Sequence, residues 1–473
     1  MSSDQVHEEH DKKDRKRRRG IRMTLAVLAV VAFLIIAVPA ICYLLFTMRA
    51  AERAEAELAK IRAAGFPVTA EELEAYHEYP PEGENVAKIW LDALKPFEYG
   101  GKVYEDDVML PLISYTEKDK PIPPPGQPWE ELEAVEKFLA KNAESIEPLH
   151  GAAENGRTGR YPVDLAKGWS ANVSSIHLLA EGRRVLALQA HAKAHRDDAR
   201  GTAKSIHALF MLGKSAEREP LFIAQLERME IQNAARELTR RTLPYVEFSE
   251  QDLALLRADV QGIDNDIAFE RGIVGDRAVS ARVFVDPKAM ADFTQESIST
   301  VAPRHDDLLL YLRIMDDFLA ASKLPWPQRI DRAMAVDNEI NALFATESRI
   351  TELRYGLTSL LLPAVASITV RFARNEASTR GADTALAIEQ FSRENGRLPE
   401  QLEELVPEFI EKAPLDPFDG RPLRYVVRKD EYVIYSIGSN RIDDGGSIHE
   451  GEDEYGNIVG DADLLFRVKR LDK

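Results

Sequence analysis

The stretch Met23–Met48, which reads MTLAVLAVVAFLIIAVPAICYLLFTM, determines how this chain is organised. Its 26 residues contain no charged side chain and are mostly Leu, Val, Ile, Ala and Phe. A helix needs only about 20 apolar residues to cross the hydrocarbon core of a bilayer, and helices of soluble domains are rarely apolar on every face. Pro39 fits this assignment, because helices in lipid tolerate proline. We therefore predict a transmembrane helix over Met23–Met48, with the lipid bilayer as its partner.

Basic residues flank this stretch unevenly, which predicts its orientation. Those before it are Lys12, Lys13, Arg15, Lys16, Arg17, Arg18, Arg19 and Arg22, whereas Arg49, Arg53 and Lys60 follow it at wider spacing. The denser cluster stays in the cytoplasm, so residues 1–22 should form a basic cytoplasmic tail. A cleaved secretory signal is the alternative, but the apolar run is longer than such signals have and its charged lead-in is extended. We expect a single-pass protein of the cell inner membrane with a periplasmic C-terminal region.

Charge and cysteine content limit the possible partners of the part that follows the anchor. Residues 1–22 carry eight Lys or Arg and five Asp or Glu, a net charge of +3, while the whole chain carries −18, which leaves −21 for the remainder. So acidic a surface argues against nucleic acid as a partner. Cys42, inside the anchor, is the only cysteine. The chain therefore forms no intramolecular disulfide and has no cysteine-based metal site.

Helical patterning dominates residues 49–365, which we predict to form an irregular, extracytoplasmic all-helical region. Apolar residues recur at helical spacing in most of it, and Thr69 with Glu72 is typical of a capping box. A proline-rich loop is expected at about 98–128, and single helices are expected over Trp129–Leu149 and Ser170–His195. Gly272, Gly275 and the run Ala278–Phe284 lie in a region that we expect to be less regular and that contains no recognisable motif.

The sequence pattern changes after Asn395, and residues 366–473 predict a small α+β domain led by a long helix. A short helix starts at Pro399, and two strand-like runs, Leu423–Arg428 and Tyr432–Ile437, predict an antiparallel hairpin. Leu464–Val468 predicts a last strand. The expected fold class is thus mainly α, with a membrane-anchored helical domain followed by this small helix-plus-hairpin domain.

The C-terminal block contains a series of short motifs in a fixed order. They are the apolar stripe Ala382, Ala385, Ile388 and Phe391, then Asn395-Gly396-Arg397-Leu398-Pro399, Pro414-Leu415-Asp416-Pro417-Phe418-Asp419-Gly420, Tyr435-Ser436-Ile437-Gly438, and the acidic pairs Asp443-Asp444 and Asp461-Ala462-Asp463. In this order they resemble the globular end of the major pseudopilin of type II secretion systems. They cover about 90 residues, a small helix-plus-strand domain of the size that folds as a unit. The whole chain is similar to large membrane proteins of planctomycete-type bacteria that carry such an end.

The N-terminus departs from the pseudopilin pattern. That family has a cleavage glycine followed by Phe-Thr-Leu-x-Glu, whereas Gly20 is followed here by Ile21-Arg22-Met23-Thr24-Leu25, without the glutamate. In a pilin the anchor and the globular end also share one helix, and here a long helical region separates them. We therefore expect an uncleaved lipid anchor.

The resemblance implies a calcium site in the acidic C-terminal loop. The implied ligands are Asn440, Asp443, Asp461 and Asp463, with Asp444, Glu452 and Asp453 as neighbours. Calcium binds six to eight oxygens of carboxylates and carbonyls on a flexible loop. A solvated acidic loop without metal is the alternative.

Two histidine pairs were weighed as metal ligands. His191 and His195 lie one helical turn apart, so both imidazoles share a face, but a metal site needs further ligands, and His195 is also compatible with a place at a helix end. His7 and His10 lie in the charged tail, which we expect to be disordered.

No catalytic motif is present: the sequence contains no phosphate loop, no dinucleotide fingerprint and no Gly-x-Ser-x-Gly element. We therefore expect a non-enzymatic envelope protein that binds or organises protein partners, near a secretion or pilus-like system by analogy. The alternative is an envelope hydrolase with an unrecognised site in the helical region. A pocket between helices that is lined by convergent titratable groups would favour the hydrolase.

Overall fold

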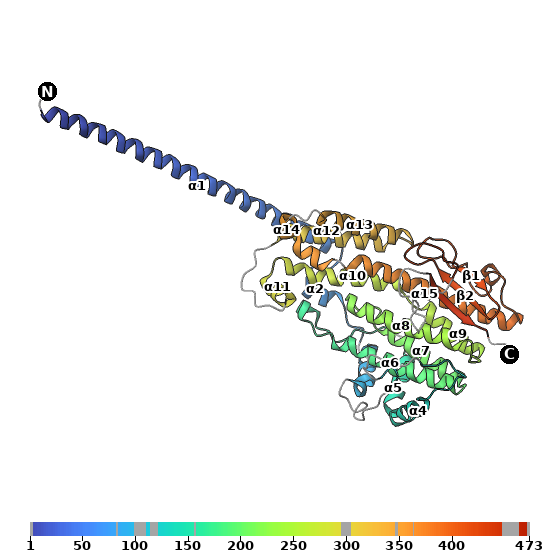
Figure 1. Cartoon of the computed structure of the whole chain (residues 1–473). Coiled ribbons are helices and arrows are strands. Elements are labelled where there is room, and N and C mark those ends of the chain that lie inside the picture. The colour runs from blue at the N-terminus through green and yellow to red at the C-terminus, as the bar shows by residue number, and fades with distance from the viewer. Residues whose placement is uncertain are drawn as a thin grey trace.

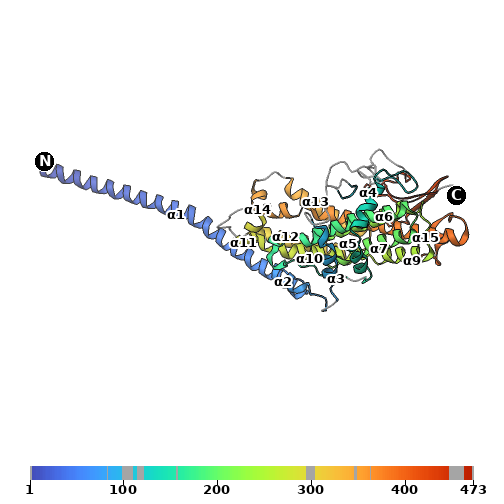
Figure 2. The same cartoon turned by 90° about the horizontal axis from the view of Figure 1, so that it is seen from below.

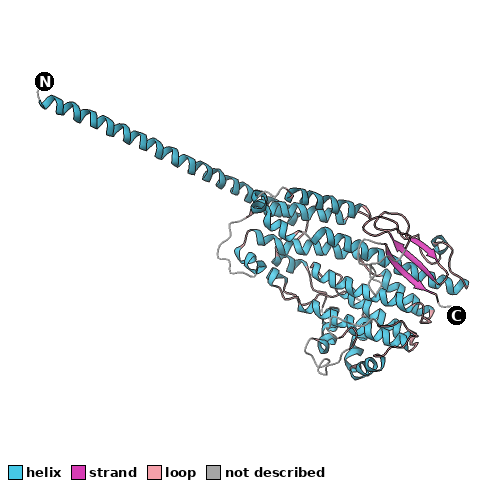
Figure 3. Cartoon of the chain, viewed as in Figure 1, coloured by secondary structure: helices cyan, strands magenta, loops and turns pink. Residues whose placement is uncertain are grey.

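The computed structural model describes residues 3–81, 84–98, 110–113, 122–155, 158–294, 304–345, 349–362, 364–446 and 463–470. The chain is mainly helical, with one small antiparallel sheet near the C-terminus (Figure 3). This confirms the predicted fold class at the level of its secondary structure.

Helix α1, Ser3–Ala63, is a single helix of 61 residues that projects from the body as a long rod (Figure 1). Large apolar side chains between Met23 and Met48 are exposed, whereas Ala50, Ala54 and Ile61 are buried. The buried part packs against α12, His305–Ser322. Among the described residues, one helix is long and apolar enough to cross a membrane, and it is α1. The C-terminal part of α1 therefore packs on the body, whereas the apolar side chains of Met23–Met48 are exposed.

The prediction of a disordered tail around His7 and His10 is wrong, because α1 already begins at Ser3. Residues 3–19 contain neither proline nor glycine and are rich in Lys, Arg and Glu. These residues favour helix, so the helix nucleated by the apolar stretch continues through them.

The body consists of packed helices, which follow one another in chain order. The first group comprises α2 (Ala70–Tyr76), α3 (Val86–Leu94), α4 (Leu132–Lys141), α5 (Ala143–Ala153), α6 (Ser174–His195), α7 (Ala199–Ser215), α8 (Phe222–Thr242) and α9 (Glu250–Gln261). The second comprises α10 (Asn265–Ala281), α11 (Pro287–Thr294), α12, α13 (Gln328–Phe344), α14 (Arg349–Leu361) and α15 (Ala364–Asn395). Short 3₁₀ turns lie at Lys95–Phe97, Leu165–Ser170, Arg282–Phe284 and Leu402–Leu405.

Local signals explain some helix boundaries. The Thr69 hydroxyl accepts a hydrogen bond from the Glu72 amide at 3.2 Å, while the Glu72 carboxylate accepts from the Val68 amide at 2.9 Å. The predicted cap is thus present with a shifted second bond. The expected helix over Trp129–Leu149 is two helices, because the Asn142 side chain donates to the Phe138 carbonyl at 2.9 Å and ends α4 there.

Two apolar clusters form most of the core. The first joins the central helices to the C-terminal block and includes Leu186, Leu209, Ile388 and Tyr432. The second joins α1 to α10 and α12 through residues such as Ile61 and Ile273. Helix α15 contacts α8, α9 and α13 as well as the strands. The C-terminal block therefore packs directly on the helical region.

The sheet has the order β1-β2-β3, with β1 at Arg424–Val427, β2 at Glu431–Ser436 and β3 at Leu464–Lys469. Both pairings are antiparallel, and Ile434 pairs with Tyr425 on one side and Phe466 on the other. The hairpin and the last strand are where the sequence pattern predicts them. The sheet lies at the end of the body opposite to the point where α1 leaves it (Figure 1, Figure 2).

Candidate functional site

The acidic loop brings together part of the predicted calcium set. Asp463 is buried, and its Oδ2 accepts hydrogen bonds from the amides of Asp444 and Gly446 at 3.1 and 2.9 Å. Its Oδ1 has no hydrogen-bond partner among the described residues. Burial raises the pKa of Asp463, and the negative charges of Asp444 and Asp443 add to this effect.

Two other predicted calcium ligands, Asp443 and Asn440, already interact with groups of the protein. Asp443 accepts from the Tyr435 hydroxyl at 3.1 Å and lies 3.5 Å from Arg424 Nε, while Asn440 accepts from the Ile442 amide at 2.9 Å. Asp461 lies outside the described residues. Within the described ranges, no group of three or more His, Cys, Asp or Glu side chains is arranged to hold a metal ion.

His191 and His195 contact other protein groups and do not form a ligand cluster with the described residues. His195 Nδ1 lies 2.9 Å from the His191 carbonyl, and its ring packs against Trp129 with centroids 4.9 Å apart. Burial lowers the pKa of both histidines, so both rings are neutral at pH 7. Neither faces a third ligand in the part of the chain that the structure describes.

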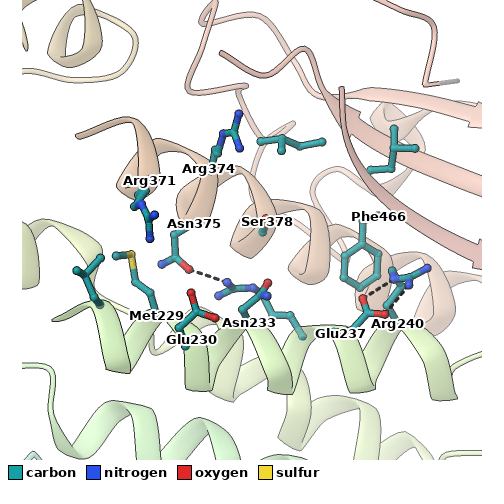
Figure 4. Close-up of a pocket in the computed structure, with 14 residues that line it drawn as sticks. Met229, Glu230, Asn233, Glu237, Arg240, Arg371, Arg374, Asn375, Ser378 and Phe466 are labelled. Atoms are coloured by element: carbon teal, nitrogen blue, oxygen red, sulfur yellow. Dashed lines mark hydrogen bonds and ion pairs between the residues drawn. The ribbon is translucent and has the colours of Figure 1, made fainter. Parts of the chain in front are cut away.

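An open groove that sequence reasoning missed lies between α8, α15 and β3, with a volume of about 460 Å³. Figure 4 shows its two helical walls, with Glu230 and Asn233 rising from α8 and Arg371 and Asn375 reaching down from α15. Leu464, Leu465 and Phe466 of β3 close one end. Helical spacing explains each wall, because residues three or four apart share one face.

A buried guanidinium forms the floor of this groove. Arg236 is 3% exposed, and its terminal nitrogens donate to Asn375 Oδ1 at 2.6 Å and Thr379 Oγ1 at 3.2 Å. Its Nε has no hydrogen-bond partner among the described residues. Burial and, to a smaller extent, the nearby Arg228 guanidinium lower the pKa of Arg236 to about 9, so the group is still mainly charged at pH 7.

The remaining charges of the groove are unevenly matched. Glu237 pairs with Arg240 through contacts of 2.5 and 2.7 Å. Arg374 donates to Ser439 at 3.0 Å, and its guanidinium points away from α8 in Figure 4. Arg371 is exposed, and no ion pair joins it to another residue in the described part of the chain. Because Arg240 and Arg374 have partners, Arg236 and Arg371 are left in the groove with Glu230.

A second pocket of about 570 Å³ lies around the end of α2 and the residues that follow it. His77 and Glu219 are both buried, with His77 Nε2 3.4 Å from Glu219 Oε1, and the same oxygen accepts from the Tyr161 amide at 2.7 Å. Arg160, which is held over the Tyr79 ring at 3.7 Å, also lines the pocket. A histidine backed by a buried carboxylate is the arrangement that general bases use.

Sequence signals for either pocket were weak. His77 and Glu219 are separated by 142 positions, and the groove combines segments near residues 230, 371 and 465. The sequence does show Arg236 and Arg240 on one α8 face, but such pairs usually mark a solvated surface. Only the fold shows that Arg236 is buried.

Comparison with known proteins adds no relative: no protein-family model, no curated protein and no solved structure matches this chain.

Proposed function

We propose that this protein is a single-pass, membrane-anchored envelope protein whose helical body binds or organises other proteins. One observation carries the proposal: α1 is exposed and apolar between Met23 and Met48, whereas from Ala50 onward it packs on the body through one face that contains Ala54 and Ile61. A continuous helix with two such halves holds a folded body directly at a bilayer surface. The uneven basic flanks favour a cytoplasmic N-terminus and a periplasmic body.

Fractionation of cells that express the full chain tests the anchor. We expect it to remain in the membrane pellet at alkaline pH, and the variant Ile35→Lys/Ile36→Lys to shift to the soluble fraction, because each charge in the apolar stretch costs about 3 kcal/mol of insertion. Ile267→Lys is the matched control on the body surface, since Ile267 is also exposed. Retention of the double-lysine variant in the pellet would contradict the proposal.

Orientation can be tested separately with single cysteines. Cys42 is the only native cysteine, so Cys42→Ser gives a clean background. We expect Lys412→Cys to react with a membrane-impermeant maleimide in intact cells and Ser3→Cys to react only after lysis. The reverse pattern would place the body in the cytoplasm.

A place beside a secretion or pilus-like machine is the more specific proposal. It is supported by the sequence motifs of residues 366–473 that resemble the major pseudopilin, and it agrees with the packing of the long helix α15 on β2 and β3. Calcium binding in the acidic loop belongs to the same proposal and is supported by the unpartnered, buried Asp463 Oδ1. Thermal melting with millimolar calcium or with chelator tests it, because a ligand that binds only the folded state raises Tm. An unchanged Tm contradicts calcium binding.

A hydrolase is the second candidate function, favoured by the pocket at His77. There the Glu219 carboxylate would orient the imidazole, and His77 would take a proton from an attacking water molecule. The test is a screen of ester, amide and phosphoester substrates with the full chain and with His77→Gln. Loss of a detected activity in His77→Gln, but not in the α6 control His195→Gln, supports this function, and equal activity in both variants excludes His77.

A further inference from the structure

The groove between α8, α15 and β3 has an excess of positive charge in a strongly acidic protein. The chain carries −18 overall, yet the groove sets the two arginines Arg236 and Arg371 against the single glutamate Glu230. Its other charged side chains already have partners, because Arg240 pairs with Glu237 and Arg374 donates to Ser439. The electrostatics of the groove therefore differ in sign from those of the chain as a whole, and a local positive field in an open groove attracts anions.

The positive charge at the floor of the groove belongs to Arg236, a buried side chain that the fold holds in place. Arg236 is held by two neutral acceptors, Asn375 and Thr379, and no carboxylate hydrogen-bonds to it among the described residues. The Glu376 and Glu230 carboxylates attract it, although neither forms an ion pair with it in the described part of the chain, and its Nε, which has no partner among the described residues, can donate a further hydrogen bond. Asn375 is itself fixed by donating to Asn265 Oδ1 at 2.8 Å, so the guanidinium has little freedom to turn away.

Arg371 supplies a second donor from the facing wall. Its side chain points from α15 into the groove (Figure 4), and it has no ion-pair partner among the described residues. Guanidinium groups are planar and donate two parallel hydrogen bonds to a carboxylate or a phosphate. Asn233 and Ser378 add neutral hydrogen-bonding groups beside them.

We propose that this groove binds the oxyanion group, phosphate or carboxylate, of an organic ligand between Arg371 and Arg236. The volume of about 460 Å³ exceeds that of a bare ion, and Met229, Leu226 and Phe466 provide apolar contacts for the rest of the ligand. Glu230, on α8 opposite Arg371, disfavours anions that do not reach the arginines. The inference does not depend on the membrane anchor, because every residue of the groove lies outside α1.

Calorimetry and thermal melting of the full chain in neutral detergent micelles test this proposal. The probes are pyrophosphate and citrate, with sodium chloride at equal ionic strength as the control for screening. We expect both probes to raise Tm beyond the salt control. Arg371→Glu should raise the Kd for them at least about tenfold, since a charge-assisted hydrogen-bonded pair contributes about 1.4 kcal/mol or more.

Matched variants separate binding in the groove from general charge effects. Arg393→Glu makes the same charge change on an exposed position of α15 outside the groove and should leave the Kd unchanged. Glu230→Gln should lower the Kd, because it removes a repelling carboxylate; a higher Kd would instead require a ligand cation and overturn the proposal. Arg236→Gln should abolish binding where it folds, and Arg371→Glu, at an exposed position, keeps the test decisive where it does not.

A third probe identifies the source of the oxyanion. Dihexanoyl phosphatidylglycerol presents the phosphate of a lipid headgroup in soluble form. An Arg371-dependent rise in Tm with this lipid alone would assign the groove to lipid headgroups, and a rise with pyrophosphate or citrate assigns it to soluble ligands. Equal responses of Arg371→Glu and Arg393→Glu to all three probes would refute the proposal.

Discussion

Gly275 is a residue whose side chain is excluded by a neighbouring backbone. A Cβ at this position would lie 1.5 Å from the Pro220 carbonyl oxygen and 2.6 Å from its carbon. We expect Gly275→Ala to destabilise the protein by about 3 kcal/mol or more, because backbone cannot move aside as a side chain can. Urea unfolding of the full chain in micelles measures this.

Gly151 provides the control for that substitution. It lies inside α5, and nothing is within 4 Å of an added Cβ. Gly151→Ala should stabilise by about 0.5–1 kcal/mol, because alanine loses less backbone entropy in a helix. Similar effects at both glycines would show that α10 does not approach Pro220 this closely.

Asp276, the next residue, should make stability depend on pH. Burial raises the pKa of Asp276 to about 7, although the Phe222 amide donates to Oδ1 at 3.3 Å and opposes this shift. The unfolded chain ionises this carboxyl near pH 4, so the folded state binds more protons between about pH 4 and pH 7. Stability contributed here therefore falls as pH rises through that window and is constant above it.

Asp276→Asn should remove this dependence, because the amide keeps the oxygen that accepts from Phe222 and cannot ionise. The full shift corresponds to about 4 kcal/mol, and partial solvent exposure reduces the expected gain at pH 8 to roughly 1–2 kcal/mol. Urea unfolding at pH 5 and pH 8 measures the difference. If the curves of wild type and variant stay parallel across this range, Asp276 is not the titrating group.

At the scale of elements, Asp416 joins the turn Pro414–Gly420 to the hairpin. Its buried carboxylate accepts from the Phe418 amide at 2.9 Å, the Ile437 amide at 2.9 Å and the Ser436 hydroxyl at 2.8 Å, and it pairs with Arg424 at 2.8 Å. Asp416→Ala leaves all four donors without this acceptor. We expect a loss of about 3–5 kcal/mol, because a buried charge pair is broken.

Asp430 is the control for the hairpin. It is an exposed residue between β1 and β2, and the hydrogen bond it accepts from the Arg470 amide uses its backbone carbonyl. Asp430→Ala should change stability by less than about 0.5 kcal/mol. Thermal melting of the two variants measures both changes in stability. Equal melting temperatures would mean that the Asp416 carboxylate does not stabilise the hairpin.

The same elements show what local sequence can predict. The hairpin could be predicted because its alternation, its turn block and its β-branched residues are all local signals. Helix α10 could not be, because Gly272 and Gly275 weaken helical propensity and are explained only by their approach to Phe222 and Pro220. The expectation of less regular structure at these glycines is therefore wrong, since both lie inside α10.

The groove could not be predicted from the sequence, for a different reason. Its walls come from α8, α15 and β3, and Arg236 meets Asn375 across 139 positions. Each segment alone reads as an ordinary helix face or strand. Of the four ligands that the acidic motif implies, the structure places Asp443 close enough to Asp463 to raise its pKa, and the calcium site itself stays a prediction.

At the scale of the whole molecule, the continuous α1 links the apolar stretch Met23–Met48 directly to the body. The Arg354 guanidinium of α14 lies 5.3 Å from the ring centre of Phe46, two positions before the end of the apolar stretch, and donates to Asp306 of α12 at 2.8 Å. If Met23–Met48 spans a bilayer as proposed, helix α14 would lie at the level of the membrane interface. The sheet lies at the opposite end of the body (Figure 1, Figure 2).

Spin labels at the two ends should therefore report different surroundings in proteoliposomes. Leu360 of α14 is 61% exposed and Val427 of β1 is 45% exposed, so both accept a label without disturbing the core. In the Cys42→Ser background we expect a nitroxide at Leu360→Cys to collide mainly with oxygen, which concentrates in lipid, and one at Val427→Cys mainly with a water-soluble nickel chelate. Because α1 is packed into the body from Ala50 onward, this difference should persist at all lipid compositions. Equal chelate accessibility at the two sites would mean that the body does not rest on the bilayer through α14, even where fractionation shows that α1 is inserted.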